Sequence, residues 1–370
     1  MSLDSQAKDL KLFSINRLYR SMEKKGGRFA AEILSPSPPG LLFDEGISST
    51  VFSNTFIELP YPEGDLSGQT VIVTGSNQGL GLEASRHLLR LGVEKLIMAV
   101  RDLKKGEAAR QELLQSTNRE ESSVEVWVLD MDSYFSVKSF ASRAAALPRL
   151  DALLANAGLA TNTFNISEED EKTITVNVVS TFLLILLLVP KLQESASKFN
   201  ITPRVTIPNS ALHYIASLEH LDPQKEGGIF KSLNNKEVSN MAGRYPLSKL
   251  LVVFGVRALA DQLAQSKAPL VIINTPNPSF CKSQLARETD NVGLRVSEKL
   301  LARSTEEGSR ALVHGIIADE KSNGQYLTNC RVHGPSCIVT DKKGVLIQEA
   351  FFKELVAKLE RIAPGVTSCL

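Results

Sequence analysis

Short apolar runs alternate with longer amphipathic stretches from Gln69 onward. The runs are rich in Val, Ile and Leu, as is typical of strands buried on both faces of a parallel sheet. The stretches between them have helical apolar spacing. The pattern predicts an α/β fold, one doubly wound parallel sheet with helices on both faces. The predicted strands are TVIVT at 70–74, KLIMAV at 95–100, VEVWVL at 124–129, ALLA at 152–155, RVTI at 204–207 and LVIINT at 270–275.

The first 50 residues do not continue this alternation. Leu10, Phe13, Arg17 and Met22 could lie on one short amphipathic helix, and SPSPPG at 35–40 interrupts any regular structure after it. We therefore expect residues 1–50 to be a partly disordered N-terminal extension, with a lid or partner-binding arm as the alternative. Residues 51–370 are expected to form one dinucleotide-binding and catalytic domain.

Composition narrows the function. A hydrophobic fraction of 43%, a charged fraction of 22% and a net charge of +1 are those of an ordinary globular protein, and they give no electrostatic reason to expect nucleic acid. The four cysteines form no CxxC pair, and no Cys/His cluster has zinc spacing. We expect reduced thiols and no metal.

The longest apolar run, 178–189, is shorter than a bilayer span and contains Ser180 and Thr181. It predicts a buried helix, and we expect no membrane span. Acidic and basic residues are mixed at the amino terminus without a secretory pattern, so a cytoplasmic location is expected, with a mitochondrial address as the open alternative.

A glycine-rich turn, TGSNQGLG at 74–81, follows the first predicted strand and leads into a helical stretch. Its glycines allow a tight turn, close approach of a pyrophosphate and close helix packing, while the helix amino terminus offers N–H groups to phosphates. Three glycines alone also fit a turn without a ligand. The strand before and the helix after favour a Rossmann-type dinucleotide site. The candidate cofactor-binding residues here are Thr74, Gly75, Asn77, Gln78, Gly79, Leu80 and Gly81.

The second predicted strand ends at Val100 and is followed by Arg101 and Asp102. An acid directly after this strand would accept a hydrogen bond from the ribose 2′-hydroxyl of NAD, whereas an arginine pairs with the 2′-phosphate of NADP. Arg101 therefore predicts NADP(H), with a solvated surface arginine as the alternative. Asp102 stays open as a competing ribose ligand.

Two further strand ends supply cofactor candidates. Asp130 follows the third strand, where it could accept from the adenine amino group, although Asp132 competes for that role. Asn156, Ala157 and Gly158 end the fourth strand in a small turn that leaves room for a cofactor.

Tyr245 and Lys249 lie four residues apart in a helical stretch and therefore share a face. An ammonium beside a phenol lowers the phenol pKa, which would suit Tyr245 for proton transfer. Ser210, shortly after the fifth strand, could hold a substrate oxygen, and Asn177 could order a water in a relay to Lys249. Taken alone, Tyr245 and Lys249 could instead be an ordinary pair of surface side chains.

Taken together, TGSNQGLG, NAG, the Asn in TVNVVSTF, Ser210 with His213, and YPLSK resemble the short-chain dehydrogenase/reductase family over about residues 51–366. The resemblance implies a catalytic tetrad of Asn177, Ser210, Tyr245 and Lys249. It also implies that Lys249 holds the nicotinamide ribose and that Arg101 marks an NADP-preferring variant. The segments LNNKEVSNMAGRYPLSKLL, ARSTEEGSRALVHG, NGQYLTNC and LERIAPGV resemble the retinol-dehydrogenase-like reductases of fungal secondary metabolism.

The sequence departs from the family at three places. Pro208-Asn209 stands where the family has Ser-Ser before the catalytic loop, and Pro278-Ser279 replaces Pro-Gly after the sixth strand. A side chain at Ser279 could tighten or partly block the nicotinamide pocket. Ser210 and Tyr245 are also unusually far apart, which predicts a substrate-loop insertion at 214–243, forming a wall or lid of the site.

These features predict an NADP(H)-dependent oxidoreductase, a ketoreductase or secondary-alcohol dehydrogenase acting on a small-molecule carbonyl or alcohol. The alternatives are an NADP(H)-binding protein without redox turnover, motivated by Ser279 and Pro208, and a non-redox cyclase or dehydratase. The apolar helix TVNVVSTFLLILLLVPKL could be core only or could pair two subunits, so homodimer and monomer both remain open.

Overall fold

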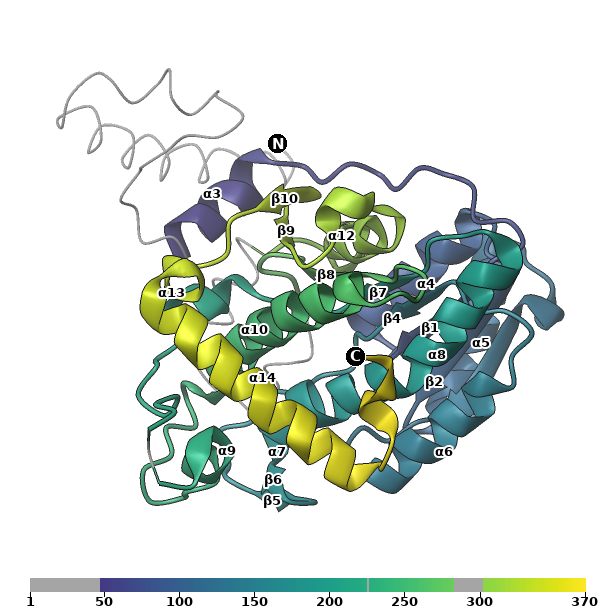
Figure 1. Cartoon of the computed structure of the whole chain (residues 1–370). Coiled ribbons are helices and arrows are strands. Elements are labelled where there is room, and N and C mark those ends of the chain that lie inside the picture. The colour runs from purple at the N-terminus through teal and green to yellow at the C-terminus, as the bar shows by residue number, and fades with distance from the viewer. Residues whose placement is uncertain (1–46, 225, 283–301) are drawn as a thin grey trace, which may run out of the picture. The chain divides into compact units, whose positions relative to one another are not determined.

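The computed structural model describes residues 47–224, 226–282 and 302–370. Its main sheet has eight strands in the order β10-β9-β8-β7-β4-β1-β2-β3 (Figure 1). The neighbours from β3 to β9 are all parallel, and β10 pairs antiparallel with β9. All six predicted strands are confirmed. The strands are β1 (Thr70–Thr74), β2 (Lys95–Val100), β3 (Val124–Val128), β4 (Ala152–Leu154), β7 (Arg204–Thr206), β8 (Ile272–Asn277), β9 (Tyr326–Thr328) and β10 (Arg331–His333).

Helices cover both faces of the sheet, as predicted (Figure 1). Alternate residues of a strand point to opposite faces, so Val71 and Val73 of β1 pack with one set of helices and Ile72 with the other. The first set is α4 (Gly79–Arg90), α5 (Leu103–Thr117) and α12 (Thr305–Ile317). The second set is α6 (Tyr134–Ala145), α8 (Thr181–Phe199), α10 (Arg244–Gln265) and α14 (Lys342–Ile362).

The strand order reverses between β1 and β4. From β1 the chain builds outward through β2 to β3, whereas β4, β7 and β8 build in the other direction. Ligands of doubly wound sheets bind in the crevice that forms at the carboxyl ends of the strands at such a reversal. The turns after β1 and β4 are therefore where the fold favours a ligand.

Five elements have no counterpart among the predicted strands and helices: β9, β10, β5, β6 and α3. β9 and β10 extend the sheet beyond β8, and β5 (Ile166–Ser167) and β6 (Asp170–Glu171) form a separate antiparallel hairpin. Helix α3 (Ile47–Phe56) crosses the expected boundary at residue 50. The predicted extension otherwise lies at residues 1–46, outside the described residues.

The chain between α3 and β1 follows the outside of α12 and α4. Leu59 is buried, and the Arg310 guanidinium donates to its carbonyl at 2.7 Å. Tyr61 packs edge-on against His87 of α4, with ring centroids 4.9 Å apart. This segment is therefore packed against the body of the domain.

The predicted insertion at 214–243 contains helix α9 (Gly228–Leu233), which docks on α14. The carboxylate of Glu354 accepts from the backbone N–H groups of Ile229 at 2.9 Å and Phe230 at 3.2 Å. The Phe230 ring stacks on Phe351, with centroids 6.0 Å apart. The insertion is thus fastened to the carboxyl-terminal helix.

One helical stretch among the described residues, Lys172–Phe199, is long and apolar enough to cross a membrane. It joins α7 (Lys172–Ile174), a π-helical turn η2 (Thr175–Ser180) and α8. The apolar run 178–189 is thus the middle of a longer helix that extends beyond it at both ends. Within its most apolar window 89% is buried in the protein, which agrees with the expected core helix.

Candidate active site

The glycine turn joins β1 to α4 at the strand reversal. Gly75 and Gly79 have φ values of +65° and +59°, which L side chains rarely adopt. A Cβ on Gly81 would lie 2.5 Å from both Asn156 Nδ2 and Gly75 O, so the helix can approach the strand this closely only with glycine there. A Cβ on Gly79 would meet nothing within 4 Å, which leaves open space over the turn.

The turn after β4 is bonded directly to the glycine turn. Asn156 Nδ2 donates to the carbonyls of Thr74 at 2.9 Å and Gly75 at 3.2 Å, and Ala157 N donates to Thr74 Oγ1 at 2.8 Å. Gly158 lies against Asn177, where a Cβ would be 3.2 Å from Oδ1. The structure therefore brings together the predicted residues of both turns.

Arg101 is exposed at the carboxyl end of β2, and its charge helps to lower the pKa of Asp132. Two nearby acids already have structural partners. Asp102 caps α5 by accepting from Lys105 N at 3.2 Å, and Asp132 pairs with Lys172. Asp130 Oδ1 accepts from the N–H of Asp132 at 3.0 Å, which holds it in its own turn.

Tyr245 and Lys249 lie on the first turns of α10 and meet the loop after β7. Lys249 Nζ lies 5.5 Å from the centroid of the Tyr245 ring and donates to the carbonyl of Pro208 at 2.7 Å. Ser210 hydrogen-bonds to the Tyr245 phenol, and its Oγ also accepts from Leu212 N at 3.2 Å. Three predicted catalytic side chains thus converge on one place.

Burial dominates the electrostatics of this pair. It raises the pKa of the Tyr245 phenol above its ordinary value, against the hydrogen bond from Ser210, which lowers it. Burial also lowers the pKa of the Lys249 ammonium to about 8. The expected lowering of the Tyr245 pKa by Lys249 is not found, because desolvation outweighs other influences on the phenol.

Asn177 lies in the π-helical turn η2, and its amide faces the turn that follows β4. Its Oδ1 accepts from Leu159 N and its Nδ2 donates to Leu159 O, both at 2.9 Å. Nδ2 also donates to Ser248 Oγ at 3.0 Å, and Ser248 Oγ donates to Tyr245 O at 2.8 Å. Asn177 is therefore joined to the start of α10 through Ser248, a residue that sequence reasoning missed.

His213 lies three residues after Ser210 and is fully buried. Its Nδ1 is 2.8 Å from the Ser210 carbonyl, which can only accept, and its Nε2 accepts from Ser336 N at 3.1 Å. These partners require a neutral ring protonated on Nδ1. Burial accordingly lowers the pKa of His213 to about 4. His213 thus ties the Ser210 backbone to the chain after β10.

Ser279 follows β8 and has φ +67°, a left-handed conformation that favours glycine. Such a conformation costs a serine on the order of 1 kcal/mol. Its Oγ donates to Asn54 Oδ1 of α3 at 2.6 Å. The Asn54 contact was not foreseen from the sequence, because the two residues are 225 positions apart.

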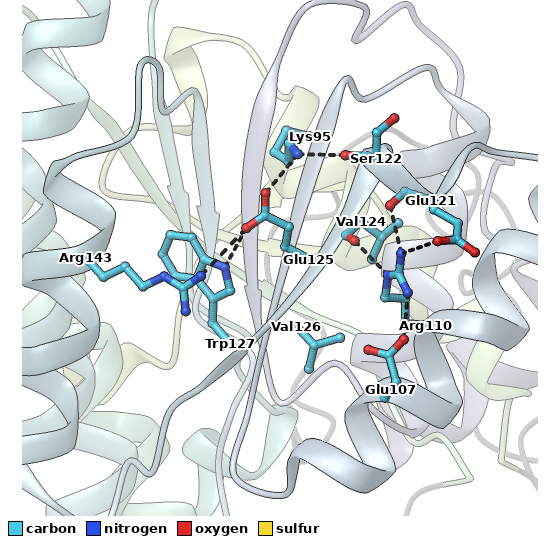
Figure 2. A pocket seen from close by; sticks show the side chains of 10 residues that line it. All are labelled: Lys95, Glu107, Arg110, Glu121, Ser122, Val124, Glu125, Val126, Trp127 and Arg143. Atoms are coloured by element: carbon cyan, nitrogen blue, oxygen red, sulfur yellow. Dashed lines mark hydrogen bonds and ion pairs between the residues drawn. The ribbon is translucent and has the colours of Figure 1, made fainter.

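A cavity of about 300 Å³ lies elsewhere, beside the starts of β2 and β3 (Figure 2). Its charges are paired with one another. Glu125 bonds Lys95 and the Trp127 indole, both at 2.9 Å, and Arg143 lies 3.8 Å from the Trp127 ring centroid (Figure 2). This cavity is at the amino edge of the sheet, away from the residues above.

A family model described as short chain dehydrogenase matches residues 69–202. Short chain dehydrogenase/reductase dmxR8 of Cryptosporiopsis is 44% identical over 324 residues, which cover 86% of this chain and 98% of that protein. The chain belongs to the short-chain dehydrogenase/reductase family. Short chain dehydrogenase atnD of Emericella nidulans is also 44% identical, over 75% of this chain and 90% of its own length.

Solved structures of the short-chain dehydrogenase/reductase fold agree with this architecture. A protein from Mycobacterium paratuberculosis superposes with a TM-score of 0.59 at 23% identity, covering 80% of this chain and 95% of its own. A short chain dehydrogenase from Shigella flexneri, complexed with NADP, gives 0.51 at 20% identity over 73% and 100%. The Rossmann-type fold expected from the sequence is confirmed.

Proposed function

We propose that this short-chain dehydrogenase/reductase is an NADP(H)-dependent ketoreductase or secondary-alcohol dehydrogenase acting on a small-molecule carbonyl. The observation that carries the proposal is the convergence of Ser210, Tyr245 and Lys249 at the carboxyl edge of the sheet. That edge also holds the glycine turn and its bonded partner turn after β4.

The residues present fit a dinucleotide. The space over Gly79 and the side-chain-free turn at Gly75 provide the close backbone approach that a pyrophosphate requires. Arg101, exposed at the end of β2, would pair with a 2′-phosphate. Thr74 and Asn156 hold the two turns in register, while Pro278 and Ser279 border the nicotinamide side.

When bound, NADPH would supply a hydride to the carbonyl carbon. Ser210 would hold the carbonyl oxygen by a hydrogen bond, and Tyr245 would transfer its phenolic proton to that oxygen, which completes the alcohol. The Tyr245 phenol, whose pKa is raised by burial, is protonated at neutral pH, which is the state from which it would donate. Lys249 would hold the ribose and, with Asn177, return a proton to Tyr245.

The substrate proposal rests on resemblance. The motifs similar to retinol-dehydrogenase-like reductases of fungal secondary metabolism support a secondary-metabolite carbonyl as the substrate. Incubating the protein with NADPH and a panel of ketones and following absorbance at the nicotinamide band tests the reaction. Consumption that requires a ketone supports it, whereas NADPH binding without consumption would favour a protein without redox turnover.

A further inference from the structure

The side chain of Asn54 holds the loop after β8 at two points. Its Oδ1 accepts from Ser279 Oγ, and its Nδ2 donates to the Phe280 carbonyl, both at 2.6 Å. The N–H of Ser279 donates to Asn277 Oδ1 at 2.9 Å. Ser279 is thus held through its backbone, its side chain and the next carbonyl. Such restraint is what a non-glycine residue needs to keep a left-handed conformation.

Arg303 joins α3 to the same loop. Its backbone N–H donates to Phe280 O at 2.9 Å, and its carbonyl accepts from Lys282 N at 3.0 Å. Its buried guanidinium donates to the carbonyls of Ser53 at 3.0 Å and Ile57 at 2.6 Å, at the carboxyl end of α3. Asn54 is therefore presented to Ser279 by a helix that is itself fixed.

The loop lies between α3 and the candidate site. A Cβ on Gly308 of α12 would overlap Cys281 Sγ and lie 3.0 Å from Leu80 Cδ2, so the loop and the glycine turn meet at this helix. On its other side, α3 contacts η3 (Ala211–Ile215), which starts directly after Ser210. The loop therefore contacts the helix beside the glycine turn, and α3, which holds the loop, contacts the segment that follows Ser210.

We propose that Asn54 is a positioning residue that keeps Ser279 in its left-handed conformation, and so sets the backbone that borders the nicotinamide. This inference rests on the proposed function. In this chain, hydrogen bonds hold Ser279 in a conformation that glycine would adopt freely. Because one of these bonds comes from Asn54, α3 becomes part of the site. Misplacement of the reacting groups by about 1 Å can cost about 100-fold in rate, whereas phosphate contacts remote from the loop keep the cofactor bound.

Asn54→Ala removes both loop contacts. We expect kcat for ketone reduction to fall by about 10-fold or more, with the NADPH dissociation constant, measured from nicotinamide fluorescence, changing by less than about 3-fold. In the protein without cofactor, amide exchange at Lys282 and Arg303 should become faster, because their N–H groups bond across the same loop.

The decisive variant is the double substitution Asn54→Ala with Ser279→Gly. Glycine adopts positive φ without help, so the loop should regain its conformation although Asn54 is absent. Most of the lost kcat and of the amide protection should return. A general loss of stability in Asn54→Ala would not be reversed by a glycine.

Asn200→Gly is the matched control, since Asn200 ends α8 at φ +50° and is exposed. Placed in the Asn54→Ala background, it should restore neither kcat nor amide protection. The proposal would be overturned if Asn54→Ala kept the kcat and the amide exchange of the wild type. It would also be overturned if adding Ser279→Gly to Asn54→Ala restored neither of them. If the wild type reduces no ketone, the proposed function fails, and amide exchange alone still decides whether Asn54 holds the loop.

Discussion

At the scale of single residues, the candidate site is built from groups whose charge state follows from burial. Tyr245 is kept protonated, Lys249 has a pKa of about 8, and His213 is kept neutral. The sequence predicted Tyr245, Lys249 and Ser210 by spacing and motif. It could not predict the direction of the Tyr245 pKa, because desolvation depends on which distant segments cover the phenol.

Replacing Tyr245 by Phe removes the proposed proton donor while the ring still fills its place. Turnover should fall by about 10² to 10⁴, since positioned proton transfer contributes that much, and NADPH affinity should hardly change. Steady-state rates and cofactor fluorescence titration measure the two effects. Full activity in Tyr245→Phe would show that another group donates the proton.

Arg101→Ala tests the cofactor. A hydrogen bond to a charged group contributes roughly 1.5 to 3 kcal/mol, so the NADPH dissociation constant should rise by about 10- to 100-fold while that of NADH stays nearly constant. Lys105→Ala, an exposed lysine on the neighbouring helix, is a charge-matched control. Equal weakening of both cofactors, or a wild type that prefers NADH, would mean that Arg101 does not contact a 2′-phosphate.

His213 predicts a pH dependence of stability. The folded protein keeps the ring neutral down to a pKa of about 4, whereas the unfolded chain takes up a proton near the ordinary value of 6.5. The neutral ring therefore contributes about 3 kcal/mol to the free energy of unfolding. This contribution is complete above pH 6.5 and is lost as the pH falls toward 4. Unfolding free energies of wild type and His213→Asn, measured between pH 7 and 4, should converge on acidification. A constant difference would contradict the neutral-ring assignment.

At the scale of elements, the strands could be predicted because their apolar runs are continuous and buried on both faces. β9 and β10 could not, since each is three residues long and β10 is entirely exposed, which leaves no apolar period to detect. Helix α3 was missed for another reason. It is stabilised by Arg303 and Asn54 contacts with segments more than 200 positions away, and no local pattern records such contacts.

A buried ion pair fixes the start of α10 against the β5–β6 hairpin. Arg244, directly before Tyr245, lies 3.4 Å from Glu171, and both side chains are almost fully buried. The Arg244 guanidinium also donates to Leu233 O at 2.9 Å and Ser239 Oγ at 2.7 Å in the insertion. Arg244 thus joins the start of α10 to the hairpin and to the insertion.

Glu171→Gln leaves the Arg244 guanidinium buried without its counter-charge. Removing one partner of a buried pair costs about 3 to 5 kcal/mol, so the urea midpoint of unfolding should fall clearly. Glu194→Gln is the control, because Glu194 pairs with Lys191 at 2.9 Å but is 56% exposed, and it should change stability by less than about 1 kcal/mol. Similar midpoints for the two variants would show that the buried pair contributes little.

At the scale of the whole molecule, the domain begins before its first strand. Ser53, Leu59 and Leu66 are buried, and the chain from α3 to β1 supplies backbone acceptors to Arg303 and Arg310. The sequence suggested a domain starting near residue 51, because the family resemblance begins there, although the strand pattern starts only at Thr70. The contacts of the described residues place α3, from Ile47, within the body that carries the candidate site.

Two truncations separate the extension from α3. Deleting residues 1–45 should leave the unfolding midpoint, NADPH affinity and kcat near those of the full chain, because α3 and its contacts remain. Deleting residues 1–57 removes the Ser53 and Ile57 carbonyls and leaves the Arg303 guanidinium, 1% exposed, without two of its acceptors. Hydrogen bonds to a charged group contribute about 1.5 to 3 kcal/mol each, so this truncation should unfold at distinctly lower urea and lose turnover as Asn54→Ala does. If the shorter chain matches the longer one in stability and kcat, α3 is dispensable; if the first deletion already abolishes activity, residues 1–45 contribute to the site.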